Sequence, residues 1–599
     1  MKNSVDLPRA HQDYTVLHLS MHKLWRIESL CLLFLSAFVL YLSTVSGSFE
    51  FVDGSEMMGA AYSLGVPHPP GYPFYTLVLK LASFVPIGAP SFRMNILGPL
   101  FGALTIILLA VLAENIDNPI GALMIALTVL LAPVFWFQTA NVKGALYIGL
   151  TSLVLAAFIA LCGKVRLPIL GLLAGFSMGF QFQGGLLMGL ALAVGLVVDR
   201  DTRQRINPRS AAFSFIFAAL GLGLYLSLPI MASSSSPFVW GSWNRFTGII
   251  EIAKWGLKTS AVEHRGFGLD GNYPYAGLVC VLVAISIVGN ILGLLSARNR
   301  CLHGAALILT LGVFLVLLPL DVMVPYFQRC LPLFACAVAA FVGVFSWWSS
   351  GRFRAYSSLF TSVVSFLGLS ATLISLLRSS PADMSRLYVA DDLSRNMISL
   401  MPRGRAVFLS FGDYVCDAIV YRQLVYGDRS DVPVLRMNMA ALSVYGDYLN
   451  SMKKRFPWLC LPSADHSGKC SLDSLSSAVI NAQPPGIPVY ADPSFATIAP
   501  VLRHTLSGNF GANGIYGRMT GTADESFSLK RVMRMRFRGQ YDAYWDRDRF
   551  TRYIYLVYAS GIRLALRERF HAGRKDAVYS KAERAIVYLM SRYNGYSRS

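Results

Sequence analysis

Long apolar runs recur along this chain from about residue 27 to about residue 377 and then stop. An α-helix needs roughly 20 consecutive apolar residues to cross a hydrocarbon core. The mean hydropathy is +0.50 and only 14% of the residues are charged, which is not the composition of an ordinary soluble protein. The pattern predicts a polytopic α-helical membrane protein.

The lengths of these runs predict about eleven transmembrane helices. They are expected at residues 27–47, 95–113, 119–137, 144–162, 167–182, 184–198, 210–230, 272–296, 302–320, 330–349 and 356–377. The runs at 167–182 and 184–198 are short and glycine-rich, so one broken unit is an alternative reading of that pair.

Basic residues gather in alternate loops between the runs. The positive-inside rule then places residues 1–26 in the cytoplasm as a tail, and an odd number of helices places residues 378–599 outside it. The net charge of +20 is carried largely by these orientation signals, so it does not indicate nucleic-acid binding. The transmembrane domain is expected at 27–377, with a first extracytoplasmic loop at 48–94.

That first loop contains FEFVDGSEMMGAAYSLGVPHPPGYPFY, from Phe49 to Tyr75. Asp53 and Glu56 are three residues apart, near the start of a predicted helix whose dipole and free amides favour anions. Four prolines fix the backbone of the following segment and hold His68 and Tyr72 on a non-helical loop. We interpret the stretch as an active site at a membrane surface; a plain capped helix followed by a turn is the alternative.

Two further segments are expected on the same side of the membrane. GYPFYTLVLKLASFVPIGAPSFR, which contains Lys80, predicts an amphipathic helix lying in the interface. The loop 231–271 is rich in aromatic and basic residues, and Arg245 is suited to bidentate phosphate contact. An interfacial aromatic belt is the other reading of this loop.

After residue 377 the pattern becomes that of a water-soluble domain. We predict strands at 406–411, 432–437 and 487–491, with a helix at 413–426 between the first two. This gives an extracytoplasmic α/β domain at 378–540, followed by a C-terminal helical hairpin at 541–599.

Several kinds of chemistry lack their motifs. There is no GxSxG elbow, no GxxxxGK loop and no metal-spaced His/Cys cluster. The sequence therefore indicates no cofactor, and a divalent metal is an alternative that it does not support. An ionised carboxylate at the outer membrane face is suited to deprotonating an acceptor while a lipid-linked phosphate leaves. Nearby cations would stabilise that phosphate.

The stretch VDGSEMMGAAYSLGVPHPPGYPFY and the following Arg93-Met94-Asn95 closely resemble the signature of the transmembrane protein 260 family of O-mannosyltransferase-like proteins, also known as domain of unknown function 2723. FVWGSWNRF and AVFLSFGDYVCDAIVYRQLVYGDRSDVPVLRMNM look similar to later parts of that family. The family often has Gly-Asp-Asn-Asp where this chain has Gly412-Asp413-Tyr414, so we assign the α/β domain to acceptor capture or to scaffolding.

The resemblance implies a glycosyltransferase C-like enzyme of a bacterial inner membrane, with its N-terminus in the cytoplasm. It implies inverting transfer of a sugar, with mannose suggested, from a polyprenyl-phosphate donor to an extracytoplasmic protein or glycan acceptor. Carried over to this chain, Asp53 is the general base and Glu56 supports it. The substrate-binding residues implied are His68, Tyr72, Lys80, Arg93, Asn95, Trp240 and Arg245.

Two other functions are open. A transporter or flippase of lipid-linked sugars would carry ionisable residues in the middle of its helices, where they are costly and usually functional. The predicted helices are nearly free of charge, which favours the enzyme. A non-catalytic membrane assembly factor has no distinguishing sequence feature.

Overall fold

The structure is a computed structural model of the 599-residue chain. It describes residues 9–50, 53–116, 119–162, 167–199, 203–204, 206–233, 236–240, 300–312, 383–401, 404–437, 446–462, 472–492, 511–513 and 516–518, with a few separate residues between 287 and 294, at 538 and between 558 and 587.

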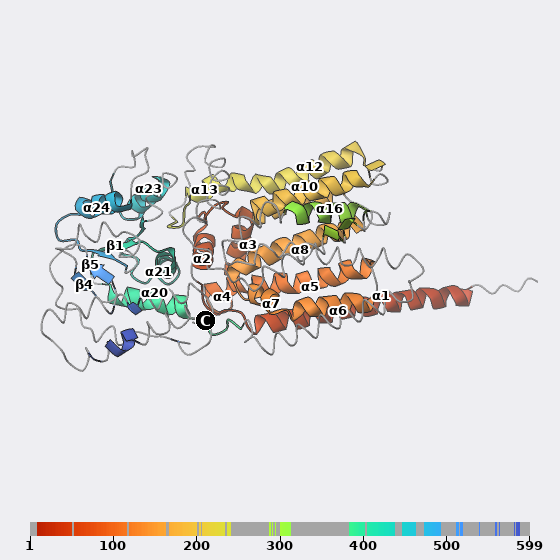
Figure 1. The fold of residues 1–599 in the computed structure, drawn as a ribbon, viewed down its shortest axis with the longest axis horizontal. Helices are drawn as coiled ribbons and strands as arrows, with labels where there is room; N and C mark the ends of the chain where they lie inside the picture. Colours follow the sequence, from red (N-terminus) through yellow and green to blue (C-terminus); the bar gives the residue numbers. More distant parts are fainter. Residues whose placement is uncertain are drawn as a thin grey trace, which may run out of the picture.

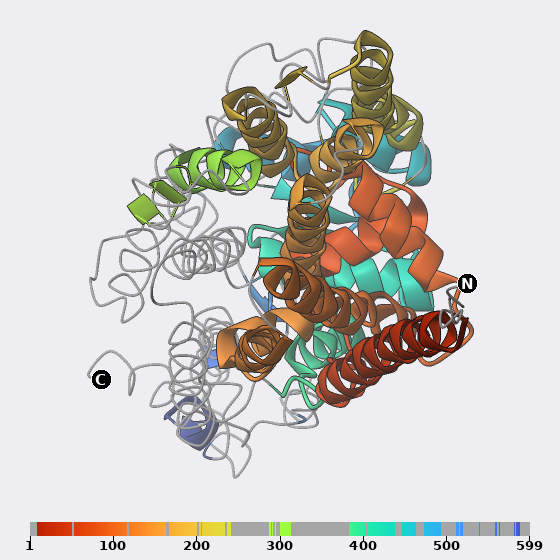
Figure 2. The same cartoon turned by 90° about the vertical axis from the view of Figure 1, so that its right-hand side faces the viewer.

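The described residues form a helical bundle at one end of the molecule and an α/β domain at the other (Figure 1). The bundle is seen end-on in Figure 2. Its helices are α1 (Arg9–Leu42), α5 (Leu97–Ile116), α6 (Pro119–Leu130), α7 (Pro133–Thr139), α8 (Val142–Cys162), α9 (Leu167–Phe180), α10 (Phe182–Val198), α12 (Pro208–Gly223) and α16 (Arg300–Gly312).

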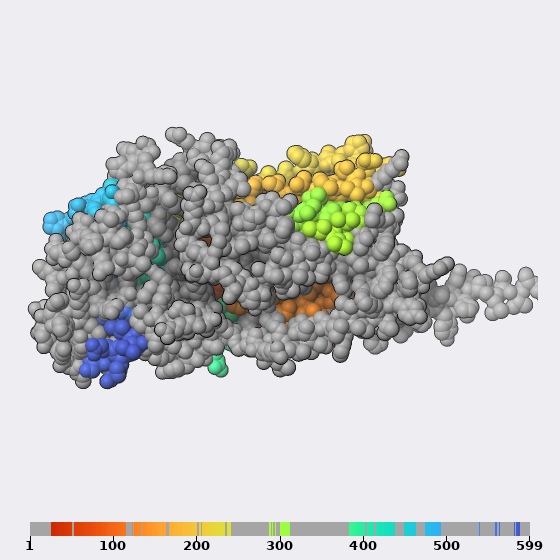
Figure 3. Space-filling model, in the orientation of Figure 1, coloured from red at the N-terminus to blue at the C-terminus, as the bar shows by residue number. Residues whose placement is uncertain are grey.

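Within the described residues, three helical segments are long and apolar enough to cross a membrane: Pro90–Glu114, Val142–Cys162 and Pro208–Ala232. Most of the second segment, 72%, is buried inside the protein, whereas only 22% of the third is. Helix α8 is therefore central, and α12 lies on the outer surface of the bundle (Figure 3), where its apolar side chains suit a lipid environment. The chain is an integral membrane protein.

Two predicted helices differ from the structure. Helix α1 begins at Arg9, so it includes much of the expected N-terminal tail; this stretch has neither glycine nor proline to stop a helix from propagating. The expected helix at 119–137 is divided into α6 and α7, because Pro133 cannot donate to the preceding turn and instead begins α7.

The pair of runs at 167–182 and 184–198 forms two helices that pack against each other. Gln181 separates them, and its side-chain oxygen accepts a hydrogen bond from the amide of Gly184, 3.0 Å away, at the start of α10. The predicted helices at 272–296, 330–349 and 356–377 and the C-terminal hairpin lie wholly or mostly outside the described residues.

Between the bundle and the α/β domain lie the helices of the first loop, α2 (Asp53–Ser63), α3 (Pro73–Ser83) and α4 (Pro90–Asn95) (Figure 1). Asp53 and Glu56 occupy the first turn of α2, as predicted. Leu81 and Phe84, at the end of α3, expose about two thirds of their surface. Such an apolar edge is what the interfacial helix expected from the sequence would require.

The α/β domain is built on a five-stranded sheet of order β2-β1-β3-β5-β4. Strand β1 pairs in parallel with β2 and β3, and β5 pairs antiparallel with β3 and β4. The predicted β-α-β unit is present. The elements are α20 (Val389–Leu400), β1 (Val407–Ser410), α21 (Asp413–Tyr426), β2 (Val434–Arg436), α23 (Gly446–Arg455), α24 (Leu472–Ala482), β3 (Val489–Ala491), β4 (Gly511–Asn513) and β5 (Tyr516–Arg518).

Alternating side chains of the parallel strands enter two different cores. Val407 and Leu409 pack in a core with residues of α23 and α24. Phe408 and Val434, one position out of phase, pack in a core that contains α20, α21 and much of the membrane bundle. The sheet is thus covered on both faces, and α21 packs directly on α2 of the first loop.

Candidate active site

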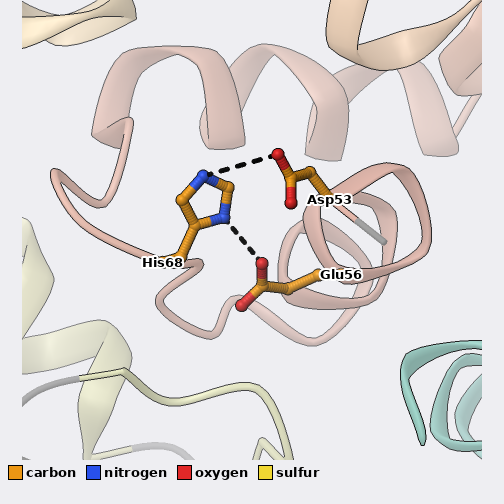
Figure 4. Close-up of side chains that lie close together, drawn as sticks. All are labelled: Asp53, Glu56 and His68. Atoms are coloured by element: carbon orange, nitrogen blue, oxygen red, sulfur yellow. Dashed lines mark hydrogen bonds and ion pairs between the residues drawn. The ribbon is translucent and has the colours of Figure 1, made fainter. Parts of the chain in front are cut away.

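Three acid-base side chains of the first loop converge at the start of α2. The imidazole of His68 lies between the carboxylates of Asp53 and Glu56, with one ring nitrogen toward each (Figure 4). Nδ1 is 2.7 Å from Glu56 Oε2 and Nε2 is 3.9 Å from Asp53 Oδ2. The structure thus brings together three of the residues that the sequence predicted to form a site.

The loop carrying His68 is fixed by a short segment from far along the chain, residues 236–240, which we call the strap. The amide of Val66 donates to the carbonyl of Phe238 at 2.8 Å, and the amide of Trp240 donates to the carbonyl of Val66 at 3.0 Å. These two bonds make a parallel bridge between Val66 and Val239. The backbone two residues before His68 is therefore held on both sides.

Two further side chains complete the cluster. Lys143, at the start of α8, donates a hydrogen bond from Nζ to Asp53 Oδ2. The hydroxyl of Tyr72 lies 3.1 Å from His68 Nε2. The ammonium of Lys143 and the imidazole of His68 therefore approach the same oxygen of Asp53, Oδ2, while about a fifth of the Asp53 side chain remains exposed.

The α/β domain reaches the same cluster from the opposite side. Arg436, the last residue of β2, places Nη2 3.6 Å from Glu56 Oε1 and 2.8 Å from Asp417 Oδ1 of α21. Its guanidinium lies 5.7 Å from the ring centre of Phe238 and 5.6 Å from that of Trp240. The strap, the first loop and the α/β domain thus meet around Glu56.

Burial alone would lower the pKa of His68, because it disfavours the charged imidazolium. The negative charges of Asp53 and Glu56, with the hydrogen bond to Glu56, oppose that effect, and Lys143 partly offsets them. The net result is a pKa of His68 above the ordinary value of 6.5. The protonated ring is the form that can donate to Glu56 and toward Asp53 together.

The other residues expected at the site are placed differently. Lys80 donates to the carbonyl of Tyr62. Arg93 donates to the carbonyl of Ser83 at the end of α3, at 3.0 Å, and to those of Ile87 and Gly88 in the loop that follows. Asn95 donates to the carbonyls of Ser46 and Ser48, both at 2.9 Å. In the part of the chain that is described, these contacts brace the loop outside the carboxylate cluster. Arg245 lies outside the described residues.

Trp240, which the resemblance implied as a substrate-binding residue, lies close to the cluster. Its ring centre is 6.1 Å from that of His68, in an edge-on arrangement. The indole also packs in the core of the α/β domain with Leu409 and Leu435. Trp240 therefore links the histidine loop to that domain.

Sequence reasoning missed Lys143, Arg436 and Asp417. Lys143 had a usable signal: it is a lone lysine next to an apolar helix, in a loop that the positive-inside pattern assigns to the outer side. Arg436 lies within VPVLRM, where it reads as an ordinary strand residue. Nothing local in the sequence indicates that its partners are on α2 and α21.

The carboxylates and the imidazole could also hold a metal ion, since one ligand atom from each of Asp53, Glu56 and His68 lies within 4.8 Å of the others. Carboxylate and imidazole are common ligands of divalent metals. In this structure Asp53 Oδ2 accepts from Lys143, and Glu56 Oε2 pairs with His68. A divalent cation would have to displace these contacts.

We expect the stability of the folded protein to fall as the pH rises through the raised pKa of His68. The folded-state pKa exceeds the ordinary 6.5, so the stabilising contribution is fully present below about 6.5 and is lost above the folded-state value. Thermal melting of the purified protein across this pH range tests the expectation. The His68→Gln variant should lose this part of the pH dependence, and an unchanged profile in that variant would contradict it.

Gly65→Ala should destabilise the protein, because there is no space for a methyl group. A Cβ at Gly65 would lie 2.2 Å from both the carbonyl oxygen of Phe238 and Oγ of Ser236 in the strap. We expect a cost of roughly 1–3 kcal/mol, as for other overpacked sites, measured by thermal or denaturant unfolding. Gly47→Ala is the matched control, since no atom lies within 4 Å of a Cβ there. Equal stability of the two variants would count against the strap contact.

Comparison with known proteins finds a family that is similar to the segment carrying most of this cluster. A family described as the Protein O-mannosyl-transferase TMEM260 N-terminal domain matches residues 53–205. The Protein O-mannosyl-transferase TMEM260 of Mus musculus is 40% identical over 77 residues, which are 13% of this chain and 11% of the mouse protein. The matching stretch is thus a small part of either chain.

Among solved structures, the apo oligosaccharyltransferase of Archaeoglobus fulgidus is similar at a TM-score of 0.45 with 12% identity, over 79% of this chain and 70% of that one. The same enzyme tethered to an acceptor peptide with the NVT sequon gives 0.42 and 12%, over 81% and 72%. The site assignment does not depend on these structures.

The segment 53–205 begins at Asp53 and contains Glu56, His68 and Lys143. Arg436 and the strap lie beyond it. The chain is therefore similar to the TMEM260 family in one segment, and that segment supplies the carboxylates, the histidine and the lysine of the cluster.

Proposed function

We propose that the protein is a membrane glycosyltransferase that moves a sugar, with mannose as the first candidate, from a polyprenyl-phosphate donor to a protein or glycan acceptor, with Asp53 as general base. The observation that carries the proposal is the arrangement around Asp53. Its carboxylate is partly exposed, contacts the ammonium of Lys143 and lies near the imidazole of His68. The match to the Protein O-mannosyl-transferase TMEM260 N-terminal domain supports this chemistry.

In this reaction, Asp53 accepts the proton of an acceptor hydroxyl as the oxygen attacks the anomeric carbon of the sugar. The new carbon–oxygen bond forms while the bond to the lipid phosphate breaks, and the phosphate leaves with the bonding electrons. Attack opposite the leaving group inverts the anomeric configuration. Lys143 is placed to compensate negative charge that accumulates beside Asp53.

Glu56 and His68 have supporting roles. Glu56 is almost fully buried, with 2% of its surface exposed, so it is a poor candidate for contact with a large acceptor. Its hydrogen bond to His68 orients the ring next to Asp53, and Tyr72 lies against the other ring nitrogen. These contacts suit a preorganised electrostatic environment around the base.

We further propose that the cluster faces the extracytoplasmic side of a bacterial inner membrane, with the N-terminus in the cytoplasm. The alternating basic loops in the sequence support this orientation. The exposed apolar edge at Leu81 and Phe84 would then lie in the outer leaflet, where a polyprenyl chain is accessible.

The direct test uses the purified full-length protein in lipid vesicles with radiolabelled polyprenyl-phosphate mannose and peptide or glycan acceptors. We expect label to appear in the acceptor. Parallel reactions with glucose-carrying donors and with diphosphate-linked donors measure the specificity for the sugar and for the phosphate group of the donor. A parallel reaction with EDTA tests for a divalent metal. If labelled lipid crosses the bilayer without acceptor labelling, the protein is a transporter and the proposal is wrong.

A further inference from the structure

The contact between Arg436 and Glu56 joins parts of the protein that are far apart in sequence. Among the described residues, Arg436 is one of the largest fully buried side chains, with 1% of its surface exposed. Its Nη2 lies between two carboxylates, Asp417 of its own domain and Glu56 of the first loop. Glu56 consequently forms an ion pair with Arg436 at one oxygen, 3.6 Å away and without a hydrogen bond, and a hydrogen bond with His68 at the other.

The surroundings leave the guanidinium little freedom. The backbone amide of Arg436 donates a hydrogen bond to the hydroxyl of Tyr448 at 2.8 Å, and this bond restrains the end of β2. The rings of Phe238 and Trp240 lie within cation–π distance of the guanidinium. The backbones of the same two strap residues form the hydrogen bonds to Val66, two residues before His68.

A buried charge is tolerated only when it is paired, and the charges here are divided between two domains. Asp417 already provides Arg436 with a partner inside the α/β domain. The additional approach to Glu56 brings positive charge to a carboxylate that in turn orients His68 beside Asp53. The α/β domain thereby reaches the acid-base cluster through the side chain of Arg436.

We propose that Arg436 is a positioning residue: it fixes the carboxylate of Glu56 and through it the imidazole of His68, so that docking of the α/β domain sets the geometry of the site. This rests on the proposed sugar transfer at Asp53. Arg436 itself touches neither donor nor acceptor in this proposal. Its effect is therefore expected on kcat and not on the KM for the donor.

The test begins with a variant in which the buried ion pair of Arg436 and Asp417 is neutralised, Arg436→Gln with Asp417→Asn. Removing both avoids leaving an unpaired buried carboxylate, so the protein should fold. We expect kcat to fall at least about 10-fold, as for other misplaced catalytic groups, with the donor KM changed less than about 2-fold. Restoring the charge with Arg436→Lys in the presence of Asp417 should recover part of the activity.

A double-mutant cycle separates this role from a general structural one. In a Glu56→Gln background, the double variant should cause little additional loss, because Arg436 acts through Glu56. The matched control is Arg429→Gln with Asp431→Asn, an exposed ion pair of the same domain whose atoms lie 2.9 Å apart. It should leave kcat unchanged. Full additivity with Glu56→Gln, or an unchanged kcat in the double variant, would overturn the proposal.

A measurement independent of turnover keeps the two proposals distinct. Diethyl pyrocarbonate labelling, mapped to His68 by mass spectrometry, reports how the imidazole is held. We expect labelling of His68 to be several-fold faster in the Arg436→Gln, Asp417→Asn variant than in the parent or in the Arg429 control. If the parent transfers no sugar, the proposed function fails, while the His68 labelling rates still support or overturn the positioning role.

Discussion

Replacing Asp53 with asparagine should abolish sugar transfer while leaving the protein folded and inserted in the membrane. The amide has nearly the same shape but cannot accept a proton at neutral pH, and loss of a general base costs roughly 100-fold to 10,000-fold in rate. The measurement is acceptor labelling by the purified variant from the polyprenyl-phosphate donor, together with its melting temperature.

The control for this substitution is Glu114→Gln. Glu114 forms an exposed ion pair with Arg26, 2.8 Å apart, at the end of α5 away from α2. Such a pair contributes little to stability, so transfer by this variant should match that of the parent. Normal activity in Asp53→Asn would remove the assigned base.

Replacing Lys143 with methionine should reduce kcat by about 100-fold, the usual effect of deleting one group that stabilises charge in the transition state. Methionine keeps most of the length and volume of the side chain but removes the ammonium that contacts Asp53 Oδ2. Arginine at this position retains the charge and should restore part of the activity. Steady-state kinetics with varied donor concentration measure both effects.

Lys80→Met is the matched substitution for Lys143→Met, since both lysines lie in the segment similar to TMEM260. Lys80 was expected from the sequence to bind substrate, but it donates to the carbonyl of Tyr62, and its ammonium lies 5.0 Å from the ring centre of Phe84. We therefore expect Lys80→Met to retain most of the activity. A larger loss from Lys80→Met than from Lys143→Met would reverse the assignment of the two lysines.

The parts of the fold that sequence predicted well are those with a strong local pattern. Strands β1, β2 and β3 and helix α21 lie where short apolar runs and turn residues indicated them, because both faces of the sheet are buried. The errors arose where a local rule was given too little weight. Pro133 divides one expected helix, and a stretch without helix-breaking residues extends α1 back to Arg9.

The site was predictable only within the first loop. The spacing of Asp53, Glu56 and the proline-held His68 indicated a shared site, and the structure brings these side chains together. Arg93 and Asn95 were expected to line it but instead bind backbone carbonyls, a role that a motif does not distinguish from ligand binding. The contact of Arg436 with Glu56 depends on how two domains dock, which no periodicity reveals.

The junction between Glu56 and Arg436 also bears on biosynthesis. The ribosome makes α2 early and β2 much later, so a growing chain contains the carboxylate well before the guanidinium that faces it. A nascent chain that stops before β2 has Asp53, His68 and Lys143 without this counterpart. We expect the site to take its final geometry only when the later-made α/β domain has folded onto the first loop, so that shorter nascent chains stay inactive.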